Sequence, residues 1–231
     1  MSKVIGILGG MGPLATCDLM EKIIHHTDAA SDQEYIHIYV DCNTSIPDRT
    51  AAILHHGKDP LPEMVKSAVR LQTMGADVLI MPCNTAHHFL EHVQKFVDIP
   101  ILNMPQETAR YLRGKGIMKA AVLATDGTIQ CGLYDEILKD EGISPIYPDI
   151  QEQETVMSLI YDCVKAGKPC NIPEKVHTMG KHLMDQGAQV LILGCTELPI
   201  AFAQLDVQAP TVDPTDVLAC AAVRYVGGKL K

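Results

Sequence analysis

Two cysteines of this chain occur in matching sequence surroundings. Cys83 lies in the segment GADVLIMPCNTAH, and Cys195 lies in the segment GAQVLILGCTELP. In each segment Gly-Ala precedes a run of apolar residues rich in Val, Leu and Ile, which is typical of a buried parallel strand. A thiol is an acid when protonated and a base or nucleophile when deprotonated. Two thiols at two strand ends therefore predict one site with two-sided acid–base chemistry.

The residues after each cysteine favour the start of a helix. Asn84 follows Cys83, and Thr196 follows Cys195. A helix N-terminus lowers the pKa of a nearby thiol, and its N–H groups bind carboxylates. We therefore expect a reactive thiolate and a carboxylate cradle at each strand end. A cysteine at one strand end is commonly a small buried apolar residue, but the repeated setting favours chemistry. The remaining cysteines are interpreted as core or incidental residues: Cys17, Cys42, Cys131, Cys163, Cys170 and Cys220.

Strands and helices alternate twice along the chain, and this alternation positions both cysteines. In the first half strands are expected at residues 3–8, 35–41, 78–81 and 100–102, with helices at 14–30, 61–74 and 85–97. In the second half strands are expected at 119–124, 143–147, 190–193 and 209–212, with helices at 127–140, 155–166, 173–186 and 197–204. Strands separated by helices form parallel sheets, and the repeat indicates an internal duplication.

The duplication predicts an α/β fold with two similar domains, each a mostly parallel sheet flanked by helices. We expect one domain from residues 1–104 plus 213–231, with the final helix 214–227 returning to it, and a second from residues 105–212. The hinges then lie near Met104 and Asp213. Ligands of open parallel sheets bind at the carboxyl ends of the strands, which is where both repeated cysteines fall.

Composition excludes several classes of protein. The 231 residues carry a net charge of −9, which disfavours binding to nucleic acid or to anionic membranes. No apolar run is long enough for a membrane helix, and no secretory signal is expected at the start. Eight cysteines without a dense loop framework predict reduced thiols and a cytoplasmic protein.

Four motifs spread along nearly the whole chain carry a resemblance to a known family. They are IGILGGMGPLAT near the start, IPDRT at 46–50, PCNTAH at 82–87 and GCTELP at 194–199. Through them the chain resembles aspartate racemases of the pyridoxal-independent aspartate/glutamate racemase family. The resemblance implies two α/β domains with the active site in the cleft between them, a homodimer, and an isomerase that needs neither cofactor nor metal.

The chemistry implied by this resemblance agrees with the two thiols. Racemisation needs a base that removes the α-hydrogen from one face and an acid that returns a proton to the other. Cys83 and Cys195 can exchange these roles, so interconversion of L- and D-aspartate is expected in both directions. The resemblance gives Asp48 and Glu197 as acidic partners that orient the thiols or accept their protons, and helix capping is the alternative role of both.

The resemblance also assigns residues to the substrate's carboxylates. Hydrogen-bond donors around the α-carboxylate stabilise the charge that develops as the α-hydrogen leaves. The residues expected there are Asn84, Thr85, Thr125 and Thr196, with Met11 lining the pocket. Arg49 suits the second carboxylate because a guanidinium binds carboxylates through two bonds, and Lys165 is its counterpart in the other domain. Taken alone, Arg49 is interpreted as a loop surface residue and Lys165 as a solvated helix end.

Two other sequence patterns point to different functions, but neither accounts for the repeated cysteine. Gly10, Gly12 and Ala15 fit the dinucleotide fingerprint G-x-G-x-x-A, but Asp41 follows at more than the usual ~20 residues, and a nicotinamide enzyme leaves the repeated cysteine unexplained. Adjacent histidines project to different sides of a helix, so no metal site is predicted, while His87 could tune Cys83. The alternatives that remain are a glutamate or broad-specificity racemase, a maleate-type isomerase or decarboxylase, and a non-catalytic amino-acid sensor.

Overall fold

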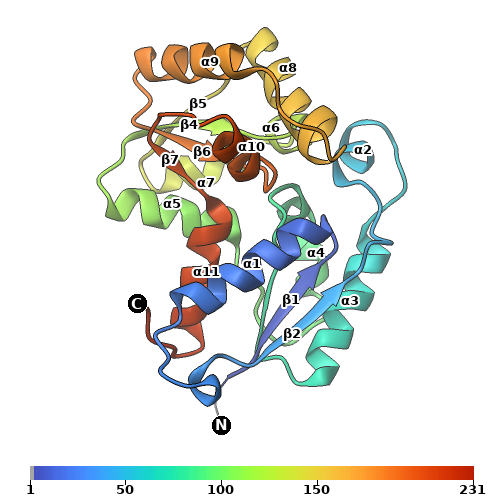
Figure 1. Ribbon diagram of the computed structural model, residues 1–231. Helices are drawn as coiled ribbons and strands as arrows, with labels where there is room; N and C mark the ends of the chain where they lie inside the picture. Colours follow the sequence, from blue (N-terminus) through green and yellow to red (C-terminus); the bar gives the residue numbers. More distant parts are fainter. Residues whose placement is uncertain (1–2) are drawn as a thin grey trace. The chain divides into compact units, whose positions relative to one another are not determined.

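The chain consists of two compact units, each built on a parallel sheet flanked by helices (Figure 1). The computed structural model describes residues 3–231. Unit 1 comprises the described residues up to Glu107 together with Thr215–Lys231, and unit 2 comprises Thr108–Pro214. The predicted α/β fold with two parallel sheets is confirmed.

Unit 1 holds a three-stranded sheet in the order β2-β1-β3. Alternate residues of its strands face two helical layers, as the period of two in a strand requires. Ile5 and Ile7 pack with helices α1 and α11, whereas Leu8 and Leu79 pack with α3 and α4. The elements of this unit are β1 (Ile5–Gly9), α1 (Pro13–His26), η1 (Asp32–Glu34), β2 (Ile38–Cys42), α2 (Arg49–Leu54), α3 (Leu61–Met74), β3 (Val78–Ile80), η2 (Thr85–Phe89), α4 (Leu90–Gln94) and α11 (Pro214–Tyr225).

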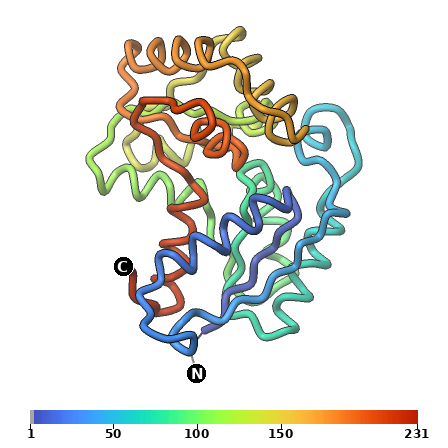
Figure 2. The backbone as a smooth tube through the Cα atoms, in the orientation of Figure 1, coloured from blue at the N-terminus to red at the C-terminus, as the bar shows by residue number. Residues whose placement is uncertain are grey.

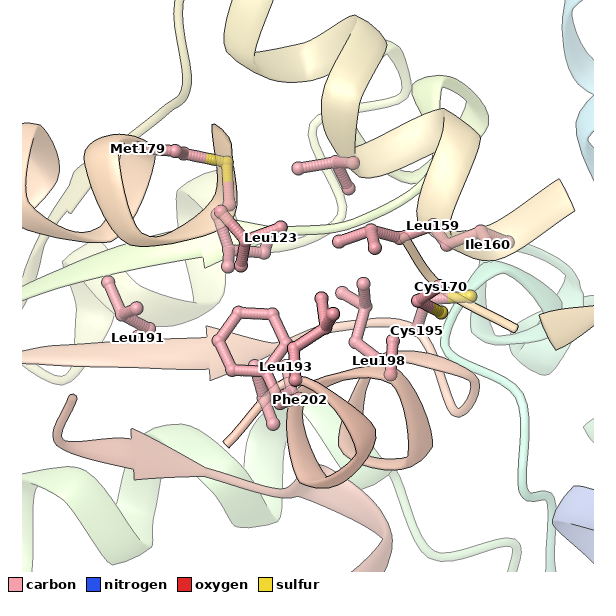
Figure 3. Close-up of a cluster of buried hydrophobic side chains, with 14 of the residues drawn as sticks. Leu123, Leu159, Ile160, Cys170, Met179, Leu191, Leu193, Cys195, Leu198 and Phe202 are labelled. Carbon is pink, nitrogen blue, oxygen red and sulfur yellow. The ribbon is translucent and has the colours of Figure 1, made fainter. Parts of the chain in front are cut away.

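Unit 2 holds a four-stranded sheet in the order β5-β4-β6-β7. On one face Leu123, Leu191 and Leu193 pack against helices α8, α9 and α10 in a single apolar cluster that also includes Cys195 (Figure 3). The elements of this unit are β4 (Lys119–Leu123), α6 (Asp126–Gln130), α7 (Asp135–Asp140), β5 (Ser144–Ile146), α8 (Ile150–Ser158), the π-helix η3 (Leu159–Val164), α9 (Pro173–Asp185), β6 (Val190–Leu193), α10 (Leu198–Gln204) and β7 (Thr211–Val212).

Two helices carry the chain from one unit to the other (Figure 2). Helix α5 (Met104–Gly114) begins in unit 1, and its later turns belong to unit 2. Helix α11 begins at the last residue of unit 2, and its apolar face, with Leu218 and Val223, packs in the core of unit 1. The connections between the units are therefore helical on both passages.

Several helices differ from the sequence-based expectation. Helix α5 was not predicted, although Asn103 caps it by accepting a hydrogen bond from the Gln106 N–H at 3.1 Å. The helix expected at 127–140 is interrupted because Gly132 has a φ of +64°, which a right-handed helix cannot contain. The helix expected at 155–166 starts five residues earlier, at a capping box formed by Asp149 and Glu152, and ends as a π-helix. The helix expected at 85–97 is the short 3-10 helix η2 followed by α4, which ends at Gln94.

Candidate active site

Cys83 lies just beyond the carboxyl end of β3 in unit 1. Its N–H donates to the Met81 carbonyl at 2.9 Å, and its side chain is buried in the cluster that includes Met11 and Ile46. The Met11 loop passes close to this end of the sheet because Gly10 has a φ of +90°, and a Cβ there would lie 2.3 Å from the Asn43 carbonyl carbon. The structure thus gathers the first and third strand ends around the Cys83 thiol.

Arg49 joins the loops that follow β1 and β2. Its Nη1 donates to the Pro47 carbonyl at 2.9 Å, and its Nη2 donates to the Met11 carbonyl at 3.3 Å. The side chain is 8% exposed, so it is not the solvated surface residue that a loop position taken alone suggests. A buried guanidinium beside Met11 gives this end of unit 1 a fixed positive charge.

Asp48 is the N-cap of α2. Its Oδ1 accepts a hydrogen bond from the Ala51 N–H at 2.7 Å, and its side chain is exposed. Within residues 3–231, no hydrogen bond joins Asp48 to Cys83. The structure therefore places Asp48 in the capping role and Arg49 one residue later, at the first position of the same helix.

Asn84, Thr85 and His87 follow Cys83 and are all buried. The His87 N–H donates to the Asn84 carbonyl at 2.9 Å, which closes the first turn of η2. The His87 ring contacts the backbone at both nitrogens: Nδ1 lies 2.8 Å from the Cys83 carbonyl oxygen, and Nε2 accepts from the Met104 N–H at 3.1 Å. The sequence predicted a role for His87 but did not predict that Met104 is its hydrogen-bond partner.

Cys195 lies at the corresponding strand end of unit 2, directly after Gly194. A Cβ on Gly194 would lie 3.0 Å from the Leu123 carbonyl oxygen, so a glycine lets β6 pass closely along the end of β4. The Cys195 thiol donates to Glu197 Oε2 at 2.9 Å, and the Thr196 hydroxyl donates to the same oxygen at 3.2 Å. All three side chains are buried. One carboxylate oxygen therefore accepts two hydrogen bonds beside the candidate thiol.

The environment of Cys195 keeps its proton on sulfur. Burial raises the pKa of the Cys195 thiol well above its ordinary value, the negative charge of Glu197 raises it further, and the Lys165 ammonium acts in the opposite direction. The expectation that a helix N-terminus lowers the pKa of this thiol is wrong, because burial and the adjacent carboxylate outweigh it. Cys195 is thus suited to act as a proton donor.

Removing the charge of Glu197 should make Cys195 more reactive. In Glu197→Gln the repulsion between thiolate and carboxylate is lost, so the pKa of Cys195 should fall and its alkylation by iodoacetamide at pH 8 should accelerate severalfold, because a larger fraction of the thiol is then ionised. The rate is read by peptide mass spectrometry of Cys195. Glu154→Gln, at an exposed position of α8, is the matched control and should leave the rate unchanged. A rate in Glu197→Gln equal to or below that of the unsubstituted protein would contradict this account.

Thr125 and Lys165 are the other residues of unit 2 that are expected to serve the same site. Thr125 follows β4 and is the buried N-cap of α6, where its hydroxyl accepts from the Thr128 N–H at 3.3 Å. Lys165 is the exposed residue that ends η3, with its Nζ 4.2 Å from the centre of the Tyr161 ring. Its charge acts on the Cys195 thiol. Gln153, which the sequence did not indicate, fixes the Thr125 loop through donation to the Ala124 carbonyl at 3.0 Å.

Two clusters away from the strand ends bring metal-ligand side chains together. His26, Asp216 and Cys220 form one, and Asp149, Glu152 and His182 form the other. In the first, His26 Nε2 and Asp216 Oδ1 lie 2.7 Å apart and connect α1 with α11. In the second, Asp149 and Glu152 form the capping box of α8. These contacts give both clusters a structural role.

Every helix within residues 3–231 is too short or too polar to span a lipid bilayer.

The chain is similar to proteins of known family over most of its length. A family described as Asp/Glu/hydantoin racemase matches residues 8–222. The broad specificity amino-acid racemase RacX of Bacillus subtilis is 29% identical over 228 residues, covering 95% of this chain and 96% of that protein. The solved structure of Picrophilus torridus aspartate racemase superposes with a TM-score of 0.82. Its sequence is 31% identical, and the match covers 99% of this chain and 96% of that protein. Glutamate racemase of Francisella tularensis shares the fold with a TM-score of 0.69. Its sequence is 18% identical, and the match covers 97% of this chain and 81% of that protein.

Proposed function

This chain belongs to the Asp/Glu/hydantoin racemase family, and we propose that it interconverts L- and D-aspartate by proton transfer at the α-carbon, without a cofactor. The observation that carries the proposal is the Cys195 thiol, which donates to Glu197 Oε2 at 2.9 Å at a strand end that matches the Cys83 strand end in sequence. A thiol held protonated at one strand end is the acid that such a reaction needs.

In the proposed mechanism one thiolate removes the α-hydrogen and the other thiol supplies a proton. With Cys83 as the base, its sulfur takes the proton from the α-carbon, and Cys195 gives its own proton to the opposite face. The thiolate left on Cys195 then makes it the base for the reverse reaction. Buried Glu197 disfavours this thiolate, while Lys165 stabilises it. The proposal requires both sulfurs to reach opposite faces of one α-carbon.

The two carboxylates of the substrate are assigned to different sets of residues. Donors around the α-carboxylate stabilise the enediolate-like charge, and we assign this role to Asn84, Thr85, Thr125 and Thr196, with Met11 lining the pocket. All five side chains are buried at strand ends. The side-chain carboxylate is assigned to Arg49 and Lys165, whose cations set a preference for acidic amino acids. Glu197 is assigned as the acidic partner of Cys195, which it contacts. Asp48, which caps α2, is assigned as the corresponding partner of Cys83.

The aspartate racemase of Picrophilus torridus supports aspartate as the substrate, since it is 31% identical to this chain. The name of RacX, a broad specificity amino-acid racemase, favours a second candidate, in which the same two thiols act on several amino acids including glutamate. One methylene separates aspartate from glutamate, and such a difference is worth only about 1–3 kcal/mol of discrimination. A homodimer in the cytoplasm is the assembly and location proposed with either substrate.

Incubation of the reduced, pyridoxal-free protein in deuterated water tests the function. L-aspartate and D-aspartate are supplied in separate reactions, and optical rotation is followed together with deuterium uptake at the α-carbon. Loss of rotation with deuterium incorporation from both enantiomers is the expected result. Comparable turnover of aspartate, glutamate and alanine in parallel reactions would establish the broad-specificity candidate instead. Binding of these amino acids without any α-hydrogen exchange would overturn both and leave an amino-acid sensor.

A further inference from the structure

A buried imidazole connects the Cys83 loop to the helix that leaves unit 1. His87 is 5% exposed, and each of its ring nitrogens meets a backbone group. Nδ1 lies 2.8 Å from the carbonyl oxygen of Cys83, four residues earlier, and Nε2 lies 3.1 Å from the amide nitrogen of Met104, the first residue of α5. The ring therefore bridges two segments that are far apart in the sequence.

The two contacts fix the protonation state of the ring. The Met104 amide can only donate, so Nε2 accepts and carries no proton. The Cys83 carbonyl can only accept, so Nδ1 carries the proton and donates. Each contact thus has one polarity, and together they require a neutral imidazole in the Nδ1–H tautomer. Addition of a second proton would set an N–H of the ring against the N–H of Met104.

We propose that His87 is a positioning residue for Cys83, holding the residue that bears the thiol against the start of α5 through a neutral ring protonated at Nδ1. This inference rests on the proposed function, because it assigns His87 to the geometry of one of the two proton-transferring thiols. It also excludes a second role: with both nitrogens bonded to backbone groups, the ring is not the base that deprotonates Cys83.

The surroundings of His87 agree with a permanently neutral ring. Burial lowers the pKa of His87 to about 4, and the carbonyls of Cys83, Leu102 and Asn84 act in the opposite direction without overcoming it. These groups belong to the backbone, so none of them changes charge. The bridge consequently persists across the pH range in which a thiol titrates.

Comparison of the two repeated segments shows that only Cys83 is followed by a histidine that can hold its backbone carbonyl. Pro199 stands four residues after Cys195, at the position that matches His87, and a proline has no polar side chain. In unit 2 the support comes instead from Glu197, which contacts the Cys195 sulfur directly. One thiol is therefore held through its backbone carbonyl and the other through its side chain, which gives the two strand ends different local chemistry.

Three variants of the full chain test the positioning role. His87→Leu fills the space but leaves the Cys83 carbonyl and the Met104 amide without the ring. His87→Gln supplies one donor and one acceptor and should restore the bridge. His88→Leu changes the exposed neighbouring histidine and is the matched control. Each variant is assayed for kcat, KM and the pH profile of aspartate racemisation per folded molecule, and for iodoacetamide alkylation of Cys83 and Cys195 in the same sample.

The expected result is a kcat reduced ~10- to 100-fold in His87→Leu, as a displacement of a catalytic group of about 1 Å implies, with KM changed less than about threefold. The Cys83 alkylation rate should change while the Cys195 rate stays constant, and the kcat of His87→Gln should remain within about fivefold of that of the unsubstituted protein.

A kcat and a Cys83 alkylation rate equal to those of the unsubstituted protein in folded His87→Leu would overturn the proposal. An equal kcat loss in His87→Gln, with one limb of the pH profile removed, would also overturn it and make the ring a base. If the unsubstituted protein racemises no amino acid, the proposed function fails, and the alkylation comparison alone still decides whether His87 positions Cys83.

Discussion

Replacement of either repeated cysteine by serine should abolish racemisation while leaving a trace of one-sided exchange. A serine hydroxyl is a far weaker acid than a thiol, so each variant loses either the base or the acid, and racemisation in both directions should fall by about 10³-fold or more. The thiol that remains can still remove and return the α-hydrogen on its own face. In deuterated water Cys195→Ser should therefore label one enantiomer without inverting it, and Cys83→Ser should label the opposite enantiomer.

This pattern distinguishes two proton-transferring thiols from a single nucleophile. The double variant Cys83→Ser/Cys195→Ser should exchange neither enantiomer and should racemise no more slowly than the single variants, since residues that act as a unit are not additive. Cys17→Ser in unit 1 and Cys131→Ser in unit 2 are control substitutions that should leave the rates unchanged. A wild-type racemisation rate in Cys83→Ser or Cys195→Ser would rule out the two-thiol mechanism and favour an isomerase or decarboxylase that uses one cysteine.

Most strands were predictable because their apolar runs are short and bounded, but the strand expected at 100–102 is only a single bridge between Leu79 and Ile101. Val190–Leu193 was predicted without error, and β3 ends one residue before its predicted end. The helix Leu61–Met74 was also predicted without error, because Gly75 with a φ of +100° stops it. The sequence pattern predicts a hinge near Met104 and not helix α5, although Asn103 and Pro105 form a common helix start. The π-helix η3 has no sequence signal that separates it from an α-helix.

The chemistry of the strand ends was only partly predictable. Glu197 is two residues from Cys195, so the sequence predicts that the two side chains are close. Whether the pKa of the thiol rises or falls depends on the balance between burial, the carboxylate and the helix N-terminus, and this balance depends on the three-dimensional structure. The His87 bridge depends on Met104, which is remote in sequence and has no distinctive side chain in the contact. Backbone partners of this kind leave no pattern in an amino-acid sequence.

Arg49→Ala should impair acidic substrates far more than alanine. If the guanidinium binds the side-chain carboxylate, its removal should lower kcat/KM for aspartate by about 10²- to 10³-fold, since hydrogen bonds to charged groups are worth ~1.5–3 kcal/mol and leave an uncompensated carboxylate when lost. Alanine has no second carboxylate, so its kcat/KM should fall less than about tenfold. Arg49→Lys keeps the positive charge without the two-pronged geometry and should lie between these values for aspartate.

The structure also gives Arg49 a role that this comparison must separate from binding. Its donations to the Pro47 carbonyl at 2.9 Å and the Met11 carbonyl at 3.3 Å join the two loops beside Cys83. Loss of these bonds would disturb the loops whatever the substrate, so an equal reduction of kcat/KM for aspartate and alanine would reassign Arg49 to structure. A thermal melt of each variant measures this contribution directly, because a purely structural arginine should lower the melting temperature in Arg49→Ala without changing the ratio of the two specificity constants. A ratio that shifts toward alanine identifies Arg49 as the residue that selects acidic amino acids.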